Sequence, residues 1–245
     1  MQVDAFAIRL RRRAKMEAAD LGVRLCQASA RSVFTCYLVV AVPVMLLALA
    51  SFELAYWAPS LVLWWLKPWL DRTVLFVLAR AAFGQTTTTR DLWQEQRSVW
   101  WRQLLTTLTV RRLSPWRSLT QPVYQLEGLS GWKLRKRSVQ IRTGHRDTAL
   151  LITSAFSFAE LALCFALLSL AIWFIPGDVQ FDWTRIFVED DPTHLISLVY
   201  YVAYAVVVAF LEPFYVAAGF ALYLNRRVEL EAWDVEQELR RAFAR

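Results

Sequence analysis

The apolar residues of this chain are gathered into three runs, at 33–83, 149–175 and 194–224, which are separated by charged segments. A helix needs about 20 mostly apolar residues to cross the roughly 30 Å hydrocarbon core of a bilayer. The second and third runs exceed that length, and the first is long enough for two crossings joined by a short turn. Hydrophobic residues make up 57% of the chain, against roughly 45–50% in soluble domains. The sequence therefore predicts an all-α integral membrane bundle with about four transmembrane helices.

The charged segments predict how this bundle is oriented. Residues 1–32 include seven basic and three acidic residues, and residues 84–148 include twelve and four, whereas 176–193 has five acidic residues and one basic residue. Lys and Arg accumulate on the cytoplasmic side of membrane proteins. We therefore expect the N-terminal segment 1–32, the insert 84–148 and a charged tail 225–245 in the bacterial cytoplasm, so that both termini are cytoplasmic and the chain lies in the inner membrane. The same bias accounts for the net charge of +7, so no nucleic-acid partner is predicted.

The first apolar run, 33–83, is predicted to be a hairpin whose second helix is interrupted at Lys67-Pro68. One interpretation is a single broken helix over 59–83, with Lys67 and Asp71 facing each other at i,i+4. The other is a crossing that ends near Leu70 and is followed by an amphipathic helix in the inner interface. We favour the broken helix, and both interpretations return the chain to the cytoplasm.

Two further segments follow from periodicity. Residues 14–31 show the pattern of an amphipathic helix, with Met16 and Ala19 on its apolar face, which could lie in the headgroup layer. The last run, 194–224, is longer than a crossing needs, and Pro213 is the natural place for it to bend because proline removes a helix hydrogen bond. The hairpin 149–224 therefore encloses the acidic external loop 176–193, and the tail that follows reads as a separate charged helix.

The insert begins with a predicted helix from about Thr89 to Val110. Thr88 can cap this helix, and Asp91 stands at the capping-box position three residues later. Its Trp93, Trp100 and Trp101 fall on one wide stripe. Indole rings are favoured at the headgroup boundary, but the same stripe could pack beneath the rest of the insert, and the sequence leaves both interpretations open.

The remainder of the insert is predicted to be an irregular stretch, 111–128, followed by a basic helix that begins at Ser130. One Ser-Pro pair, at 114–115, and one Gln-Pro pair, at 121–122, interrupt the stretch. The basic helix offers a surface to anionic lipid headgroups or to a protein partner. Together with the tryptophans Trp93, Trp100 and Trp101, this surface consists of Lys133, Arg135, Lys136 and Arg137.

Two carboxylates, Glu160 and Glu212, fall inside predicted transmembrane helices. A charged residue at the centre of a membrane helix costs about 2.5–3.5 kcal/mol on translocon scales unless it is paired. The partners that the sequence offers are Lys67, Asp71 and Arg72, together with the tyrosines of the last run. Such a cluster can be a proton or cation path, or it can join helices to one another, and we favour the structural role on the sequence alone.

No catalytic, cofactor-binding or metal site is predicted. The chain has no phosphate-binding glycine loop, no Gly-x-Ser-x-Gly and no His-Glu-x-x-His. The cysteines Cys26, Cys36 and Cys164 have no metal-ligand spacing and are predicted to be buried apolar side chains. We therefore expect that this protein is not an enzyme.

Several stretches of the chain resemble an uncharacterised family of proteobacterial inner-membrane proteins. The longest is the C-terminal signature EPFYVAAGFALYLNRR, residues 212–227, which continues as ELEAWD at 229–234. The others are 64–68 with Asp71-Arg72, 111–115 with Arg117-Ser118, and 122–129. The resemblance implies a membrane assembly that includes an AAA ATPase system, and it implies no activity and no cofactor.

The function predicted from the sequence is a scaffold or subunit of a membrane protein assembly. It would present the insert 84–148 and the charged tail to a membrane or cytoplasmic partner. The alternative is a small transporter or channel component that uses Glu160 and Glu212. Paired basic and acidic surfaces on the tail and the insert favour the scaffold, and a water-lined cavity connecting these two glutamates would favour the alternative.

Overall fold

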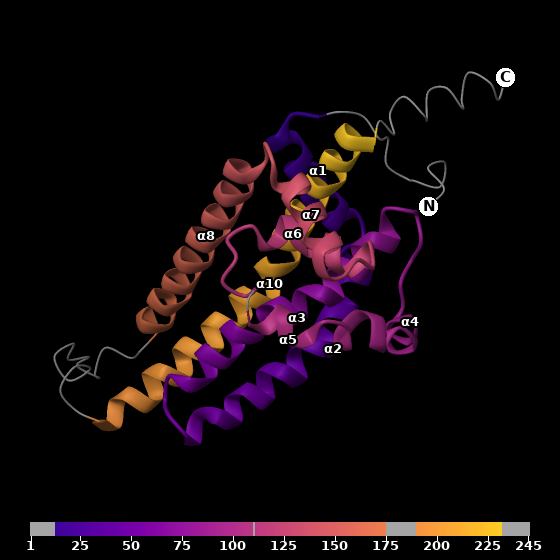
Figure 1. Ribbon diagram of the computed structural model, residues 1–245. Helices are drawn as coiled ribbons and strands as arrows, with labels where there is room; N and C mark the ends of the chain where they lie inside the picture. The colour runs from indigo at the N-terminus through magenta and orange to yellow at the C-terminus, as the bar shows by residue number, and fades with distance from the viewer. Residues whose placement is uncertain (1–12, 110, 175–189, 232–245) are drawn as a thin grey trace.

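The computed structural model describes residues 13–109, 111–174 and 190–231 (Figure 1), and these ranges are helical without any strand. Three helical segments are long and apolar enough to cross a membrane: Ala30–Glu53, Arg146–Leu170 and Ile196–Glu231. This agrees with the predicted all-α membrane bundle. The elements are α1 (Lys15–Ala28), α2 (Ala30–Leu49), η2 (Ala50–Glu53), α3 (Ala58–Ala81), α4 (Thr89–Gln94), η3 (Arg97–Trp101), α5 (Leu104–Leu108), α6 (Arg117–Leu126), α7 (Gly131–Arg142), α8 (Arg146–Trp173) and α10 (Asp190–Glu231).

Helices α2 and α3 form the predicted hairpin, with the short η2 at its turn. α3 is one uninterrupted helix through Lys67-Pro68, so the predicted break and the predicted end near Leu70 are both wrong. Pro68 has no amide hydrogen to bond the carbonyl of Trp64, four residues earlier. Instead, Arg112 Nη2 donates to that carbonyl at 2.6 Å. A side chain from the insert thus replaces the missing backbone bond.

Helix α10 has 42 residues, which at about 1.5 Å per residue is roughly 63 Å, twice the thickness of a hydrocarbon core. It passes through Pro213 and includes the first residues of the predicted separate tail helix. Its early turns expose apolar side chains, whereas 215–225 is buried. In Figure 1 this second part runs among α1, α6 and α7, which pack against it. The rest of the predicted tail, and most of the predicted external loop, lie outside the described residues.

Helix α1 packs along α10, and its predicted location in the headgroup layer stays a prediction. Ala18, Ala19, Gly22 and Cys26 form its buried face. A Cβ on Gly22 would lie 2.1 Å from the carbonyl oxygen of Ala217, so only glycine allows this approach. Of the residues predicted on its apolar face, Ala19 is buried and Met16 is exposed.

The insert is more divided than predicted. The capping box of Thr88 and Asp91 is confirmed, but the helix that it begins ends after two turns instead of reaching Val110. A π-helical turn, η3, and a left-handed residue, Gln103 with φ 55°, separate α4 from α5. The stretch predicted to be irregular contains α6, with Pro122 inside it. α7 is the predicted basic helix, although the Ser130 side chain makes no capping hydrogen bond.

Candidate functional site

An ion-pair network joins α3, α8 and α10. The Lys67 ammonium of α3 lies 2.6 Å from Glu160 Oε2 of α8 and 2.7 Å from Glu212 Oε2 of α10. Lys67 and Glu212 are buried, and Glu160 is partly buried. Glu160 and Glu212, the two carboxylates predicted to need partners, therefore share Lys67. Lys67 is one of the partners that the sequence offered.

The network continues into the insert through Arg117 of α6. Arg117 Nη2 lies 2.9 Å from Glu212 Oε1 and 3.1 Å from Asp71 Oδ2. Asp71 was predicted to face Lys67 at i,i+4. That pairing is wrong, because Lys67 bonds the two glutamates while Asp71 contacts the guanidinium of another helix. Three carboxylates and two cations thus alternate in one chain of contacts, which four helices supply.

Burial makes this cluster energetically demanding. Taking ions out of water costs several kcal/mol per ion, and good geometry with multiple partners is needed to offset it. Each cation here contacts two carboxylates, which meets that requirement. Removing either cation would leave its two carboxylates buried with only one cation in the network to compensate three negative charges.

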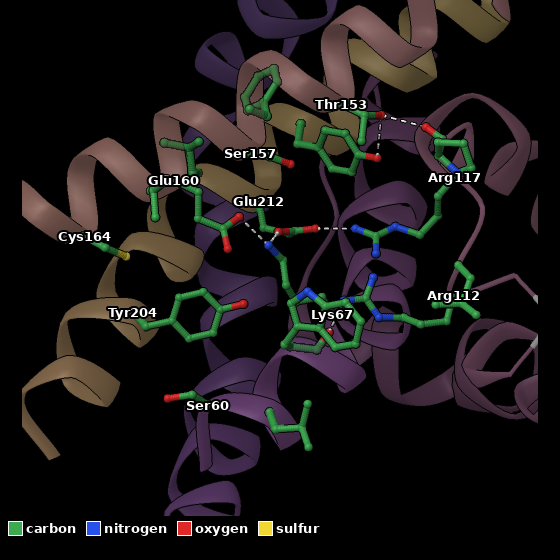
Figure 2. Close-up of a pocket in the computed structure, with 18 of the residues that line it drawn as sticks. Ser60, Lys67, Arg112, Arg117, Thr153, Ser157, Glu160, Cys164, Tyr204 and Glu212 are labelled. Carbon is green, nitrogen blue, oxygen red and sulfur yellow. Dashed lines mark hydrogen bonds and ion pairs between the residues drawn. The ribbon is translucent and has the colours of Figure 1, made fainter. Parts of the chain in front are cut away.

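A cavity of about 690 Å³ opens beside the network (Figure 2). Glu160, Glu212 and Lys67 all line it, so one space reaches both intramembrane glutamates. Its polar wall also includes hydroxyl groups. These belong to Ser60, Ser114, Thr153, Ser157, Tyr200, Tyr204 and Tyr215.

Arg112 also lines the cavity and was not predicted as a site residue. Its side chain stacks over the ring of Trp64, with 3.7 Å between the guanidinium carbon and the ring centroid. Only 8% of the residue is exposed, and its Nε makes no hydrogen bond. Figure 2 shows its guanidinium pointing toward Tyr204 across the site.

The two arginines have different charge environments. Burial opposes the charge of Arg117, but Asp71 and Glu212 raise its pKa above the usual value. The pKa of Arg112 is instead lowered, first by burial and then by the positive charge of Arg117. Arg112 is therefore the less compensated cation of the pair.

Arg72 does not join the glutamates. Its Nη1 donates to Thr107 Oγ1 at 3.3 Å, and the residue is almost completely buried beneath the insert. The prediction of Arg72 as a counter-charge for Glu160 or Glu212 is therefore wrong.

The predicted tryptophan stripe is divided between core and surface. Trp100 is buried, and its indole N–H donates to Thr73 Oγ1 at 3.0 Å. Trp93 is 54% exposed and Trp101 is 64% exposed. Of the three tryptophans, only Trp100 therefore packs beneath the rest of the insert.

The predicted basic surface on α7 is likewise divided. Lys133, Arg135 and Lys136 are exposed. Arg137 bonds Glu127 of the insert at 2.9 Å and also Glu231 at the end of α10. Burial opposes the charge of Arg137, but these hydrogen bonds raise its pKa overall.

The residues that sequence reasoning missed are Arg112 and Arg117. Both belong to a stretch that two prolines made look irregular, and their charges were attributed to the cytoplasmic bias of the whole insert. The available signal was the repeated arginine at 111, 112 and 117 beside apolar residues. The tyrosines of the last run were predicted as hydrogen-bond donors, and Tyr215 lies 3.3 Å from Thr153 by their hydroxyl oxygens.

Among the described residues, no group of three or more His, Cys, Asp or Glu side chains is arranged to hold a metal ion. The three cysteines are buried and unpaired with one another, as predicted. Comparison with protein-family models, with curated proteins and with solved structures finds no match for this chain.

Proposed function

We propose that this protein is a four-crossing membrane protein and a small transporter or channel component, with Lys67, Glu160 and Glu212 as its functional site. The observation that carries the proposal is that one cavity reaches both intramembrane glutamates and the lysine between them. Ionisable residues inside membrane helices mark ion or substrate pathways by default. This arrangement favours a transporter or channel component over the scaffold predicted from the sequence.

The fourth crossing in this proposal is α3, beside α2, α8 and the first half of α10. α3 has 24 residues, or about 36 Å of helix, enough for a hydrocarbon core. Its early turns expose Leu61, Trp64 and Trp65, while its charged residues Lys67, Asp71 and Arg72 are buried inside the protein. The orientation follows from the basic insert, which we place in the bacterial cytoplasm together with both termini.

The network supplies a place for a transferable proton. Its directly paired members are three carboxylates and two cations, so the carboxylates outnumber the cations by one. A proton taken up at Glu160 neutralises the most exposed of the three paired residues Lys67, Glu160 and Glu212. Lys67 then retains Glu212 as its partner, so uptake breaks only one ion pair. No catalytic residue and no cofactor take part in this proposal.

Flux into proteoliposomes tests the proposed function. With a pH-sensitive dye inside and a potassium diffusion potential across the membrane, the wild-type protein is expected to conduct protons, and Glu160→Gln to lose most of that flux. Ser157→Ala, a change at the same cavity that removes no charge, is the matched control and should conduct normally. A Glu160→Gln protein that is folded and conducts as well as the wild type would count against this function.

The second candidate remains a scaffold, favoured by the exposed tryptophan and basic side chains of the insert. Trp93, Trp101, Lys133, Arg135 and Lys136 reach the surface, where they can meet anionic lipid headgroups or a partner. The family resemblance adds an AAA ATPase system as the proposed kind of partner. Affinity purification from native membranes tests it: a stoichiometric partner should be recovered with the wild type and lost when the three basic residues are replaced by alanine.

A further inference from the structure

We propose that the cavity beside the ion-pair network binds an anionic amphiphile, a phosphate or carboxylate head group with an alkyl chain, and that Arg112 binds the head group. This inference rests on the proposed function, because it names the class of molecule that the same site accepts.

Among the described residues, Arg112 is the cation lining this cavity that has no carboxylate partner. Lys67 and Arg117 each contact two carboxylates, whereas the guanidinium of Arg112 contacts a backbone carbonyl and an aromatic ring. Its Nε is buried without a hydrogen-bond partner. A guanidinium has five N–H donors in a planar fork that matches phosphate and carboxylate oxygens. An anion in the cavity would supply the missing acceptors.

A cationic ligand fits this site less well. The carboxylates that it would need, Glu160 and Glu212, are already bonded to Lys67 and Arg117. A cation would have to displace one of those buried partners. An anion at Arg112 displaces none, and it removes the cost of an uncompensated buried charge.

The cavity has an apolar wall as well as a polar one. Trp57, Leu61 and Trp64 of the α3 region and Leu161 of α8 line it, and all four are 39% exposed or more. α8 leaves most of its apolar surface uncovered by the rest of the protein. Because the apolar wall continues onto surfaces that we place in the bilayer, an alkyl chain can lie along it while the head group reaches Arg112. A free inorganic anion would leave this wall unused.

Calorimetric titration of the full chain in a non-ionic detergent tests the inference. The probes are dioctanoyl phosphatidic acid, decanoate, dioctanoyl phosphatidylcholine and inorganic phosphate. We expect saturable binding of phosphatidic acid or decanoate with a Kd at least tenfold lower than for the other two. Tighter binding of phosphatidic acid identifies a phospholipid as the source, and tighter binding of decanoate identifies a fatty acid.

Three results with the wild-type protein would overturn the inference. Equal binding of phosphatidylcholine would mean that the site does not select negative charge. Equal binding of inorganic phosphate would mean that the alkyl chain contributes nothing. Absence of binding by both anionic amphiphiles would mean that the cavity does not accept this class at all.

A pair of arginine variants localises the head group. Arg112→Gln is expected to raise the Kd at least tenfold, and Arg90→Gln to change it less than twofold. Arg90 is the control because it is an exposed arginine of α4 that does not line the cavity. A folded Arg112→Gln protein with unchanged affinity would overturn the role of Arg112. If that variant does not fold, the head-group comparison in the wild type still decides the ligand class.

Binding and flux can fail separately. Proton flux without binding of either amphiphile would leave the proposed transport function standing and reject this ligand class. Binding without flux would support the ligand class and reject transport.

Discussion

Pro68 and Arg112 show how a residue far along the chain can determine whether a helix continues. Proline removes a backbone donor and usually kinks or ends a helix. Here the freed Trp64 carbonyl accepts a hydrogen bond from Arg112 Nη2 at 2.6 Å, and α3 continues. Because Arg112 is 44 positions beyond Pro68 in the sequence, no local pattern can reveal this compensation.

Arg117 is the residue whose loss should destabilise the fold most. Arg117→Ala would leave Asp71 and Glu212 buried with one cation, Lys67, to share between them and Glu160. Breaking a buried ion pair by removing one partner costs about 3–5 kcal/mol. We expect a loss of that size in the free energy of unfolding, measured by thermal or denaturant unfolding in detergent.

The matched control restores the charge balance. In the double variant Arg117→Ala with Asp71→Asn, one cation and one carboxylate are removed together, and we expect at least half of the lost stability to return. If the two changes simply add, the Arg117–Asp71 contact is not the source of the effect.

Cys26 should be chemically inert in the folded protein. Its pKa is raised to about 11 by burial within α1. The thiolate is the reactive form, so a rise from 9 to about 11 lowers the reactive fraction roughly a hundredfold at neutral pH. We expect no maleimide labelling of Cys26 at pH 7.5 until the protein is denatured, as judged by mass spectrometry of peptides. A cysteine placed at exposed Val139 should label within minutes, and equal labelling at both positions would contradict the packing of α1.

At the residue scale, the sequence could predict part of the network for a clear physical reason. Glu160, Glu212 and Lys67 are charges inside apolar runs, and such charges must find one another. The partner of Asp71 could not be predicted in this way. The i,i+4 rule compares residues on one helix. Arg117 belongs to another helix, α6, which was not predicted because prolines interrupt that part of the sequence.

Among the helices, the closest approach of α6 to α10 depends on a glycine. A Cβ on Gly219 would lie 2.2 Å from Ser118 Cβ and 2.7 Å from the Ser118 carbonyl oxygen. Gly219→Ala must therefore separate the two helices and shift Arg117, the residue before Ser118. Overpacking of this kind costs about 1–3 kcal/mol, and more where backbone must move. We expect a loss at the upper end of that range, measured by thermal unfolding.

Gly131→Ala is the comparison for this effect. Nothing lies within 4 Å of a Cβ added there, although its φ of +59° disfavours alanine by about 1–2 kcal/mol. A Gly219→Ala protein that is no less stable than Gly131→Ala would show that α6 does not pack this closely on α10.

Elements were predicted well where one face is apolar for many turns and poorly where proline punctuates the chain. α8 lies close to the predicted apolar run 149–175, and α7 begins one residue after the predicted Ser130. α6 was missed because Pro122 was taken as an interruption, and the predicted continuous helix after Thr88 was wrong because Gln103 adopts a left-handed conformation. Glycine is the residue that usually marks a left-handed conformation. Because residue 103 is a glutamine, the apolar periodicity predicted that the helix continues past it.

At the scale of the whole molecule, α10 connects two environments. Its first half exposes Val202, Val206 and Phe210, and its second half is enclosed by α1, α6 and α7. The ion-pair network lies at the change between them, with Glu212 on α10 and Arg117 on α6. Hydropathy could predict the long apolar run. It could not predict whether lipid or other helices surround the second half of α10, because both surroundings are apolar.

α8 is the least buried of the three candidate membrane spans, and only 11% of its apolar window is buried. Toward its middle, Glu160 bonds Lys67 at 2.6 Å, and closer to its start Thr153 donates to the Pro115 carbonyl at 2.9 Å. We therefore expect Glu160→Gln to increase the population in which α8 has moved away from α3. If the ion pair contributes about 1.4 kcal/mol, that population rises roughly tenfold.

Spin labels on Leu170→Cys of α8 and Leu47→Cys of α2, both exposed positions, measure this movement by electron–electron double resonance. The wild-type protein should give one narrow distance distribution, and Glu160→Gln a broader one with a longer component. Glu53→Gln, which removes the same charge at an exposed position at the end of η2, should leave the distribution narrow. If Glu160→Gln leaves it narrow as well, the bilayer and the contacts of α8 with α10 are sufficient to place this helix, and the ion pair with Lys67 is not what closes the cavity.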